Sequence, residues 1–242
     1  MKIVVLAGGL STERDVSLAS GAGICRTLRE RGHEALLLDV YLGLPYDADK
    51  LEEVFTLPNA NLEIAEGIKT TEPDLDAIKA SREDQSDCFL GPNVVEICRM
   101  ADIVFMALHG DVGENGKLQA TFDLLGIKYT GPNYLGSALA MDKGVTKMIF
   151  KMSGVPTPLG TALKKEKKDT PLSDLGLKLP VVVKPCSGGS SIGVYIVRTE
   201  EEYKDAIEKS FSYEDEVVIE PYIKGREFAC GIIDGKALPV IE

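Results

Sequence analysis

The chain has 242 residues, which is long enough for one large domain or two ordinary ones. Its 27 Lys and Arg against 38 Asp and Glu give a formal net charge of −11, which argues against a nucleic-acid interface and against a surface that binds anionic lipid. Five cysteines without C-x-x-C spacing and only two histidines argue against a disulfide framework, a zinc ribbon or a multi-histidine metal site. We therefore expect a globular cytoplasmic protein with reduced thiols.

The start of the chain has the pattern of a βαβ unit. Residues 2–7 form an apolar run typical of a buried parallel strand, and the run is too short for a signal-peptide core or a membrane span. A glycine turn at 8–13 follows, and the pattern then predicts a helix over 16–31 with Gly32 at its C-terminal cap. A second buried strand is predicted over 35–40.

The middle of the chain is interrupted by a segment with poor periodicity. Residues 43–93 are rich in Pro, Asp, Asn and Gly, which favours an insertion with short helices or a hairpin. The pattern then resumes with a helix over 94–100, a buried strand over 103–108, a glycine-rich loop over 109–116, a helix over 117–125 closed by Gly126, and a short strand over 127–130.

A second unit is predicted after the break at 131–133. Its surface run at 164–174 is highly charged, which is typical of a solvated segment. The other predicted elements are two helices within 134–153 closed by Gly154, an extended segment at 156–158, strands over 181–184 and 193–197, a helix over 200–211, and strands over 217–220, 227–233 and 237–241, the last two joined by a type I′ turn at Asp234-Gly235.

The glycine turn at 8–13 is the first candidate site. With Asp39 at the end of the next strand it resembles a dinucleotide site, but the G-x-G-x-x-G pattern is absent, so an oxidoreductase that binds NAD is disfavoured. Glu13 lies near a helix N-terminus at the carboxyl edge of the sheet, where ligands bind. Its carboxylate either holds an ammonium group or only interacts with the helix dipole.

A Ser/Gly loop after a buried strand is the second candidate. Lys184 ends the strand, and Ser187 to Gly193 allow backbone N–H groups to converge on an anion. The loop is not a Walker A motif, because no Lys and no helix follow it. A phosphate site is favoured over an ordinary flexible hairpin, with the charge of Lys184 facing the phosphate.

Two further segments are weaker signals by themselves. Glu220 to Glu227 combines a strand end with two acids that suit a planar base and ribose hydroxyls, although this segment taken alone favours an exposed connection. His109 ends a predicted strand beside the Glu13 edge, where it is either a catalytic or a structural histidine.

Taken together, these motifs resemble the D-alanine–D-alanine ligases of the ATP-grasp superfamily. They occur in the family's order along the whole chain except residues 43–93. The matching segments are Gly8-Gly9 with Ser11 to Leu18, Ala107 to Gly110 with Gly113 to Gly116, Tyr129 to Gly131, Ser137 to Lys143, Val183 to Pro185 with Gly189 to Gly193, and Glu220 with Glu227-Phe228.

The resemblance implies a fold and a division into domains. The expected class is α/β, with an N-terminal open parallel sheet and helices (pre-ATP-grasp, Rossmann-like), an α+β ATP-grasp central domain and an incomplete third domain. The expected boundaries are 1–131 for the substrate domain, 132–216 for the central subdomain and 217–242 for the start of the C-terminal subdomain.

The resemblance also implies a reaction and its residues. ATP phosphorylates the carboxylate of one D-alanine, and the amine of a second attacks, which yields a dipeptide for peptidoglycan synthesis. Glu13, His109 and Ser190 would be catalytic. The other implied contacts are Val16 and Ser17 for the substrate, and Lys143, Lys184, Gly189, Ser190, Ser191, Glu220, Ile223 and Glu227 for ATP.

Three departures from the family pattern affect these expectations. Pro221 stands where some relatives have Lys, and Asn115 replaces a common Asp. The sequence ends at Glu242, before the segment that supplies the family's lid and its Mg²⁺ ligands. We therefore expect a C-terminally truncated member that uses ATP and Mg²⁺ but has no metal ligands of its own, and that is inactive as this chain alone.

Other functions stay open at this point. One alternative is a relative that makes D-Ala-D-Ser or D-Ala-D-lactate, and another is a non-catalytic nucleotide-binding module. The expected partners are D-alanine and ATP, without nucleic acid or membrane, and the intact family member is expected to be a homodimer.

Overall fold

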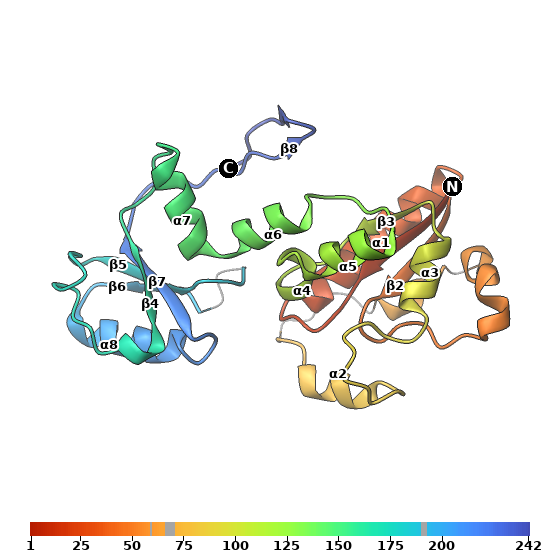
Figure 1. The fold of residues 1–242 in the computed structure, drawn as a ribbon, viewed down its shortest axis with the longest axis horizontal. Helices are drawn as coiled ribbons and strands as arrows, with labels where there is room; N and C mark the ends of the chain where they lie inside the picture. Colours follow the sequence, from red (N-terminus) through yellow and green to blue (C-terminus); the bar gives the residue numbers. More distant parts are fainter. Residues whose placement is uncertain (59, 66–70, 190–192) are drawn as a thin grey trace. The chain divides into compact units, whose positions relative to one another are not determined.

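The computed structural model describes residues 1–58, 60–65, 71–189 and 193–242 (Figure 1). The chain divides into two compact units, each with its own hydrophobic core. The first unit comprises residues 1–146 with 187–192, and the second comprises residues 147–186 with 193–242. No helix within the described ranges is long and apolar enough to cross a membrane.

A parallel three-stranded sheet forms the centre of the first unit. Its strands are, in spatial order, β2 (Glu34–Asp39), β1 (Lys2–Ala7) and β3 (Ile103–Met106). All three were predicted from apolar runs, and β3 ends two residues before its predicted end. The predicted strand over 127–130 is reduced to a single parallel bridge between Val104 and Tyr129.

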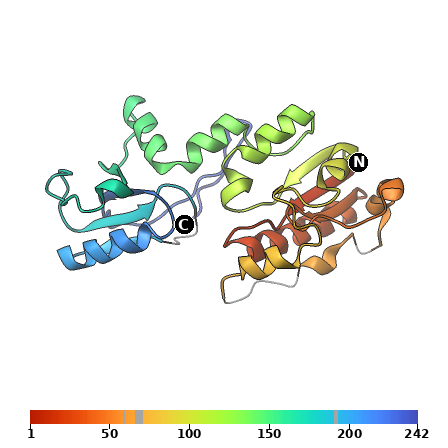
Figure 2. The same ribbon diagram turned by 60° about the horizontal axis from the view of Figure 1, so that its bottom comes forward.

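Helices cover both faces of this sheet, which explains why its strands are continuously apolar. Val4 and Leu6 point to one face, where they pack with η1 (Ala48–Thr56), α3 (Val94–Met100) and α5 (Lys117–Leu125). Ile3 and Val5 point to the other face and pack against α1 (Arg14–Glu30). Figure 2 shows the helices of this unit on the two sides of its sheet.

The ends of α1 follow local rules. The helix begins two residues earlier than predicted, because the carbonyl of Glu13 already accepts a hydrogen bond from the N–H of Ser17 at 3.0 Å. At the other end Gly32 has a φ of 81°, and the N–H of His33 reaches back to the carbonyl of Leu28 at 3.1 Å. The predicted glycine cap is therefore confirmed.

The segment 43–93 contains short helices, as predicted, and no hairpin within its described residues. They are η1, η2 (Leu62–Ile64) and α2 (Leu75–Ser81). The other short helices of the chain are α4 (Asp111–Glu114), α6 (Tyr134–Met141), α7 (Lys143–Met152) and η3 (Lys165–Lys167).

The second unit is built on an antiparallel four-stranded sheet. Its spatial order is β4 (Thr161–Lys164), β7 (Glu216–Pro221), β5 (Val181–Pro185) and β6 (Tyr195–Val197). Helix α8 (Glu200–Ser210) packs against one face, where alternate strand residues such as Val183 and Ile219 are buried. Together with the first unit, this gives the mixed α/β architecture expected of the chain.

Two strand predictions near the C-terminal end were wrong in length. The predicted strands over 227–233 and 237–241 are reduced to β8 (Ile232–Ile233) and β9 (Lys236–Ala237), with one bridge between Ala229 and Ile241. The turn between them is of the predicted type, since Asp234 and Gly235 have φ values of 49° and 74°. The side chains of both short strands are exposed, so no packing extends the ladder.

A buried ion pair ties three parts of the first unit together. The Arg14 guanidinium donates to the carboxylate of Asp39 and, at 2.7 Å, to the carbonyl of Gly9. The second oxygen of Asp39 accepts hydrogen bonds from the N–H groups of Tyr41 at 2.8 Å and Leu42 at 3.0 Å. The pair therefore connects the turn after β1, the first residue of α1 and the end of β2.

Removal of one partner of this pair should destabilise the first unit. We expect Asp39→Ala to lower the free energy of unfolding by about 3–5 kcal/mol, because Arg14 would keep a buried charge without its counter-ion. Denaturant unfolding would measure this. Asp76→Ala, which removes an exposed partner of Lys79, is the control and should have almost no effect. Equal effects of the two substitutions would contradict the assignment.

Candidate functional site

The candidate site of the first unit begins where β1 and β3 end. Ser17 links these two strand ends, because its hydroxyl accepts from the N–H of Gly8 at 2.9 Å and donates to the carbonyl of Ala107 at 2.7 Å. Its side chain is fully buried. The structure thus gives Ser17 a role in holding the loops, and its predicted contact with a substrate stays a prediction.

The carboxylate of Glu13 lies at this edge of the sheet. A Cβ added to Gly110 would lie 3.0 Å from its Oε2 atom, and one added to Gly189 would lie 3.5 Å away. Glu13 is half-buried, and within the described ranges no hydrogen-bond donor reaches its carboxylate. A partly desolvated anion at the carboxyl edge of a parallel sheet is suited to bind a cationic group.

His109 lies at the same edge, on the loop that follows β3. Its carbonyl accepts a hydrogen bond from the hydroxyl of Ser11 at 2.8 Å, which fixes this loop to the turn after β1. The residue is half-buried beside Gly9 and Gly110. Val16, in contrast, is 39% exposed on the first turn of α1. The structure therefore brings together Glu13 and His109, as the sequence predicted.

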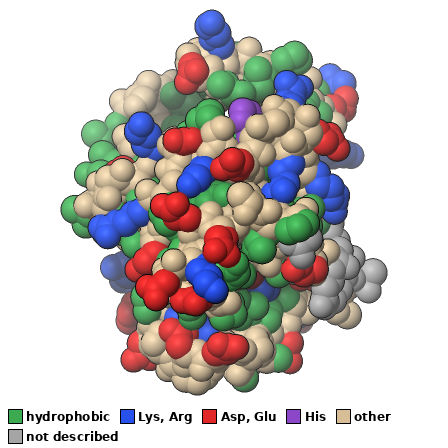
Figure 3. Space-filling model, turned by 90° about the vertical axis from the view of Figure 1, so that its right-hand side faces the viewer, with side chains coloured by type: hydrophobic (Ala, Val, Ile, Leu, Met, Phe, Trp, Pro, Cys, Tyr) green, Lys and Arg blue, Asp and Glu red, His purple; other side chains and the backbone are tan. Residues whose placement is uncertain are grey.

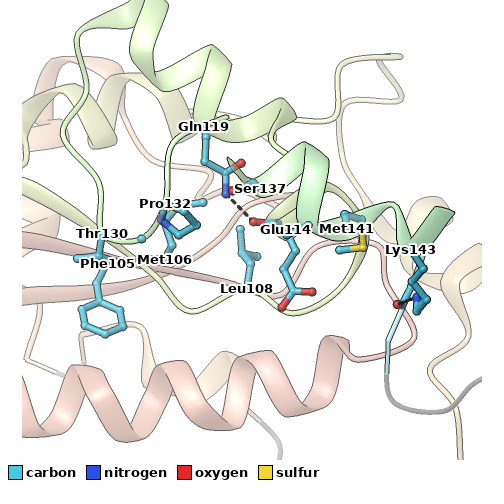
Figure 4. Close-up of a pocket in the computed structure, with 14 residues that line it drawn as sticks. Phe105, Met106, Leu108, Glu114, Gln119, Thr130, Pro132, Ser137, Met141 and Lys143 are labelled. Carbon is cyan, nitrogen blue, oxygen red and sulfur yellow. Dashed lines mark hydrogen bonds between the residues drawn. The ribbon is translucent and has the colours of Figure 1, made fainter. Parts of the chain in front are cut away.

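A cavity of about 560 Å³ opens next to these loops within the first unit (Figure 4). Most of its lining is apolar and includes Leu108 and Met141, while Glu114 and Lys143 supply charges. The buried amide of Gln119 donates to the carbonyl of Gly113 at 2.8 Å. This volume is sufficient for a small-molecule ligand.

Lys143 connects this cavity to the Ser/Gly loop. Its ammonium donates to the carbonyl oxygens of Ser187 at 3.2 Å and Gly188 at 2.8 Å. The predicted phosphate ligands Ser190 and Ser191 lie outside the described residues. The described part of the loop therefore places a lysine and Gly189 beside the Glu13 edge, within one unit.

The second unit contains a separate cluster of charges on its sheet. Val182 pairs with Glu220 and Lys184 pairs with Val218, so Lys184 and Glu220 are diagonal neighbours on the same face. Lys184 and Glu220 form a salt bridge, and the second carboxylate oxygen of Glu220 is paired with Lys147 from α7. The three side chains are between 12% and 22% exposed.

Close packing holds this cluster in place. A Cβ on Gly160 would lie 2.7 Å from the Cβ of Glu220 and 3.0 Å from the Cε of Lys147. The ammonium of Lys147 also lies 3.4 Å from the hydroxyl of Thr157. A larger residue at position 160 would therefore displace the carboxylate and its partner.

The two lysines determine the ionisation of Glu220. Burial raises the pKa of its carboxyl, but hydrogen bonds from Lys147 and Lys184 outweigh that effect and lower the pKa below the ordinary value of 4.5. Glu220 is therefore an anion at neutral pH, and the cluster carries one negative charge and two positive charges.

The remaining predicted ATP residues follow β7. Ile223 is 66% exposed and Glu227 is also exposed. In the described part of the chain, neither forms a hydrogen bond or ion pair with Glu220. Sequence reasoning missed Lys147. Its signal was the spacing of four residues after Lys143, which places both lysines on one face of α7.

Acidic and basic side chains are interspersed over the face of the molecule drawn in Figure 3. Among the residues coloured there, no broad area carries a single sign.

No group of three or more His, Cys, Asp or Glu is placed to hold a metal ion within the described ranges.

The pKa of Glu220 provides a direct test of the cluster. Its carboxyl resonance in an NMR titration should have a midpoint below pH 4.5, and Lys147→Met should raise that midpoint. Because the unfolded chain binds this proton more tightly, the stability that Glu220 contributes is present above pH 4.5 and is lost as the pH falls through the lower folded pKa. Lys165→Met, at an exposed pair, is the control. A midpoint at or above 4.5 in the unaltered protein would contradict the cluster.

Two models of one protein family together match most of the chain. The model of the "D-ala D-ala ligase N-terminus" matches residues 2–132, and that of the "D-ala D-ala ligase C-terminus" matches residues 149–242. The D-alanine–D-alanine ligase of Lacticaseibacillus casei is 43% identical over 245 residues, which cover 100% of this chain and 67% of the relative. The D-alanine–D-alanine ligase of Geobacter sulfurreducens is 35% identical over 241 residues, which cover 100% of this chain and 61% of that relative.

Solved structures give the same result. The D-alanine–D-alanine ligase of Bacillus anthracis is 34% identical with a TM-score of 0.70, and the alignment covers 99% of this chain and 63% of that one. A structure of the enzyme from the same species complexed with ATP is 32% identical with a TM-score of 0.71, and the alignment covers 99% of this chain and 65% of that one. The chain thus spans about two thirds of the length of these relatives. The chain belongs to the D-alanine–D-alanine ligase family of ATP-dependent ligases.

Proposed function

We propose that the protein joins two D-alanine molecules at the expense of ATP for peptidoglycan synthesis. The observation that supports this most directly is the carboxylate of Glu13, which lies beside Gly189 of the Ser/Gly loop and accepts no hydrogen bond from the residues that the structure describes. The ammonium group of an amino acid can pair with Glu13. The carboxylate of the same amino acid must then meet a phosphoryl group near the Ser/Gly loop. The family membership supplies the reaction class.

The proposed reaction has two steps. A carboxylate oxygen of the first D-alanine attacks the γ-phosphorus of ATP, and the bond to the bridging oxygen breaks to release ADP. The amine of the second D-alanine then attacks the carbonyl carbon of this acyl phosphate. It loses a proton, and inorganic phosphate leaves as the peptide bond forms.

Glu13 and His109 are the proposed substrate residues. Glu13 holds the ammonium of the first D-alanine by charge-assisted hydrogen bonds, which orients its carboxylate. His109 lies at the same edge, close to that carboxylate. Val16 and Ser17 belong to the same proposed subsite, Ser17 through the loops that its hydroxyl fixes.

The phosphates of ATP are the proposed ligands of the lysines and the Ser/Gly loop. Lys143 and Lys184 supply positive charge where negative charge spreads over oxygen in the transition state. Gly189, Ser190 and Ser191 supply loop donors, and Ser190 also links this loop to the substrate. The lowered pKa of Glu220 keeps its carboxylate available as an acceptor.

Glu220, Ile223 and Glu227 are the proposed adenosine residues. Carboxylates accept from the ribose hydroxyls and the base, and Ile223 is exposed and available to a ring. Pro221 lacks only an N–H group, so its carbonyl still serves as an acceptor.

The remaining features of the proposal rest on the family resemblance. Mg²⁺ is a proposed cofactor that would neutralise phosphate charge, without ligands assigned in this chain. A homodimer in the cytoplasm, without nucleic-acid or membrane partners, and the boundaries 1–131, 132–216 and 217–242 are proposed with it.

The reaction can be tested by coupled detection of its products. A full-length version that spans the whole length of the relatives should form ADP and the D-Ala-D-Ala dipeptide from ATP, magnesium and D-alanine, whereas residues 1–242 alone should not turn over. In the full-length version, Lys184→Ala should lower the rate at least tenfold because it removes a positive charge that faces the phosphate. Lys165→Ala is the matched surface control. Formation of ADP without dipeptide, or equal rates for the two variants, would contradict the proposal.

Glu13 gives a more specific test. In a full-length version, Glu13→Gln keeps the shape but removes the charge opposite the ammonium, so the KM for the first D-alanine should rise about tenfold or more. The affinity for ATP should stay within about twofold. An equal loss of ATP affinity would show that Glu13 is not a substrate residue.

A further inference from the structure

We propose that Lys147 is a positioning residue, which neutralises Glu220 when the ammonium of Lys184 moves from that carboxylate to a phosphate of ATP. This inference rests on the proposed function, because it needs ATP at the Lys184 face of the sheet. It adds a residue that neither the motifs nor the family comparison single out.

The geometry gives each lysine its own oxygen. The ammonium of Lys147 donates to Oε2 of Glu220, and that of Lys184 donates to Oε1. The two contacts come from different elements, helix α7 and strand β5. One can therefore be lost while the other is retained.

Charge balance makes the second lysine necessary. The side chain of Glu220 is 12% exposed, so an uncompensated charge there would be costly. If Lys184 were its only partner, the phosphate of ATP would have to compete with a buried ion pair. With Lys147 present, Glu220 keeps a counter-ion before and after ATP binds. The positive charge of Lys184 is then not needed to balance Glu220 and can pair with the phosphate.

The surroundings of the two lysines assign them different tasks. Lys147 is confined by the close approach of Gly160 and has Thr157 as its other polar neighbour. Its side chain is 14% exposed, whereas that of Lys184 is 22% exposed. Lys147 therefore stays with Glu220, and Lys184, on the strand that leads into the Ser/Gly loop, faces the phosphate.

Equilibrium calorimetry with ATP and with adenosine separates this role from general damage. Lys147→Met should weaken ATP binding about tenfold, because Lys184 must then leave Glu220 without a counter-ion. Adenosine does not attract Lys184, so its affinity should change by less than about twofold. Lys165→Met, which removes a lysine from an exposed pair in the same unit, should change neither affinity.

A double-mutant cycle tests whether Lys147 acts through Glu220. In a Glu220→Gln background the shared anion is gone, so adding Lys147→Met should cause no further loss of ATP affinity. A tenfold loss that persists in that background would make Lys147 a direct phosphate ligand and overturn the proposal. Equal losses for ATP and adenosine would overturn it as well.

The proposed function has its own point of failure in this experiment. If the unaltered protein binds neither ATP nor adenosine, the proposed function fails and this inference fails with it. If the unaltered protein binds ATP and Lys147→Met binds it equally well, only the positioning role is refuted.

Discussion

The carboxylate of Asp39 organises the polar edge of the first unit. It sits at the end of β2, 2% exposed, and satisfies the guanidinium of Arg14 together with several backbone N–H groups. Gly8 makes this possible, because a Cβ there would lie 2.3 Å from the carboxylate. Since Arg14 is the first residue of α1, the same contact fixes where that helix starts and so where Glu13 is presented.

The buried carboxylates of Asp39 and Glu220 are balanced in different ways. Asp39 is paired with Arg14 and with backbone N–H groups of the turn that follows it, all of which belong to the fold itself. Glu220 has two cationic side chains and one charge, so one lysine can be withdrawn while the carboxylate stays paired. The first arrangement is suited to a fixed scaffold, and the second to a site that exchanges ion pairs with a ligand.

The sequence predicted the features that depend on local physics. Strands β1, β2 and β3 are short apolar runs, and burial on both faces requires such runs. Gly32 and the Asp234-Gly235 turn depend on φ values that few other residues tolerate. Glu13 and His109 could be placed at one edge because parallel strands align their carboxyl ends. The order of the family motifs along the chain then combined these separate signals into one family resemblance.

Features that depend on distant partners could not be predicted in this way. β4 exists because it pairs with β7, more than 50 residues later, and only Leu163 of its four residues is buried, so no periodicity marks it. The 43–93 segment was too irregular for any prediction beyond short helices or a hairpin.

Lys147 shows the same limit for the site. A lysine on an amphipathic helix is expected to be solvated, and only the tertiary contact between α7 and β7 brings Lys147 to Glu220. The roles of Val16, Ile223 and Glu227 rest on motif position alone, since the structure leaves these side chains exposed. The chemistry of the second unit thus depends on a contact between residues 73 positions apart, which no local pattern encodes.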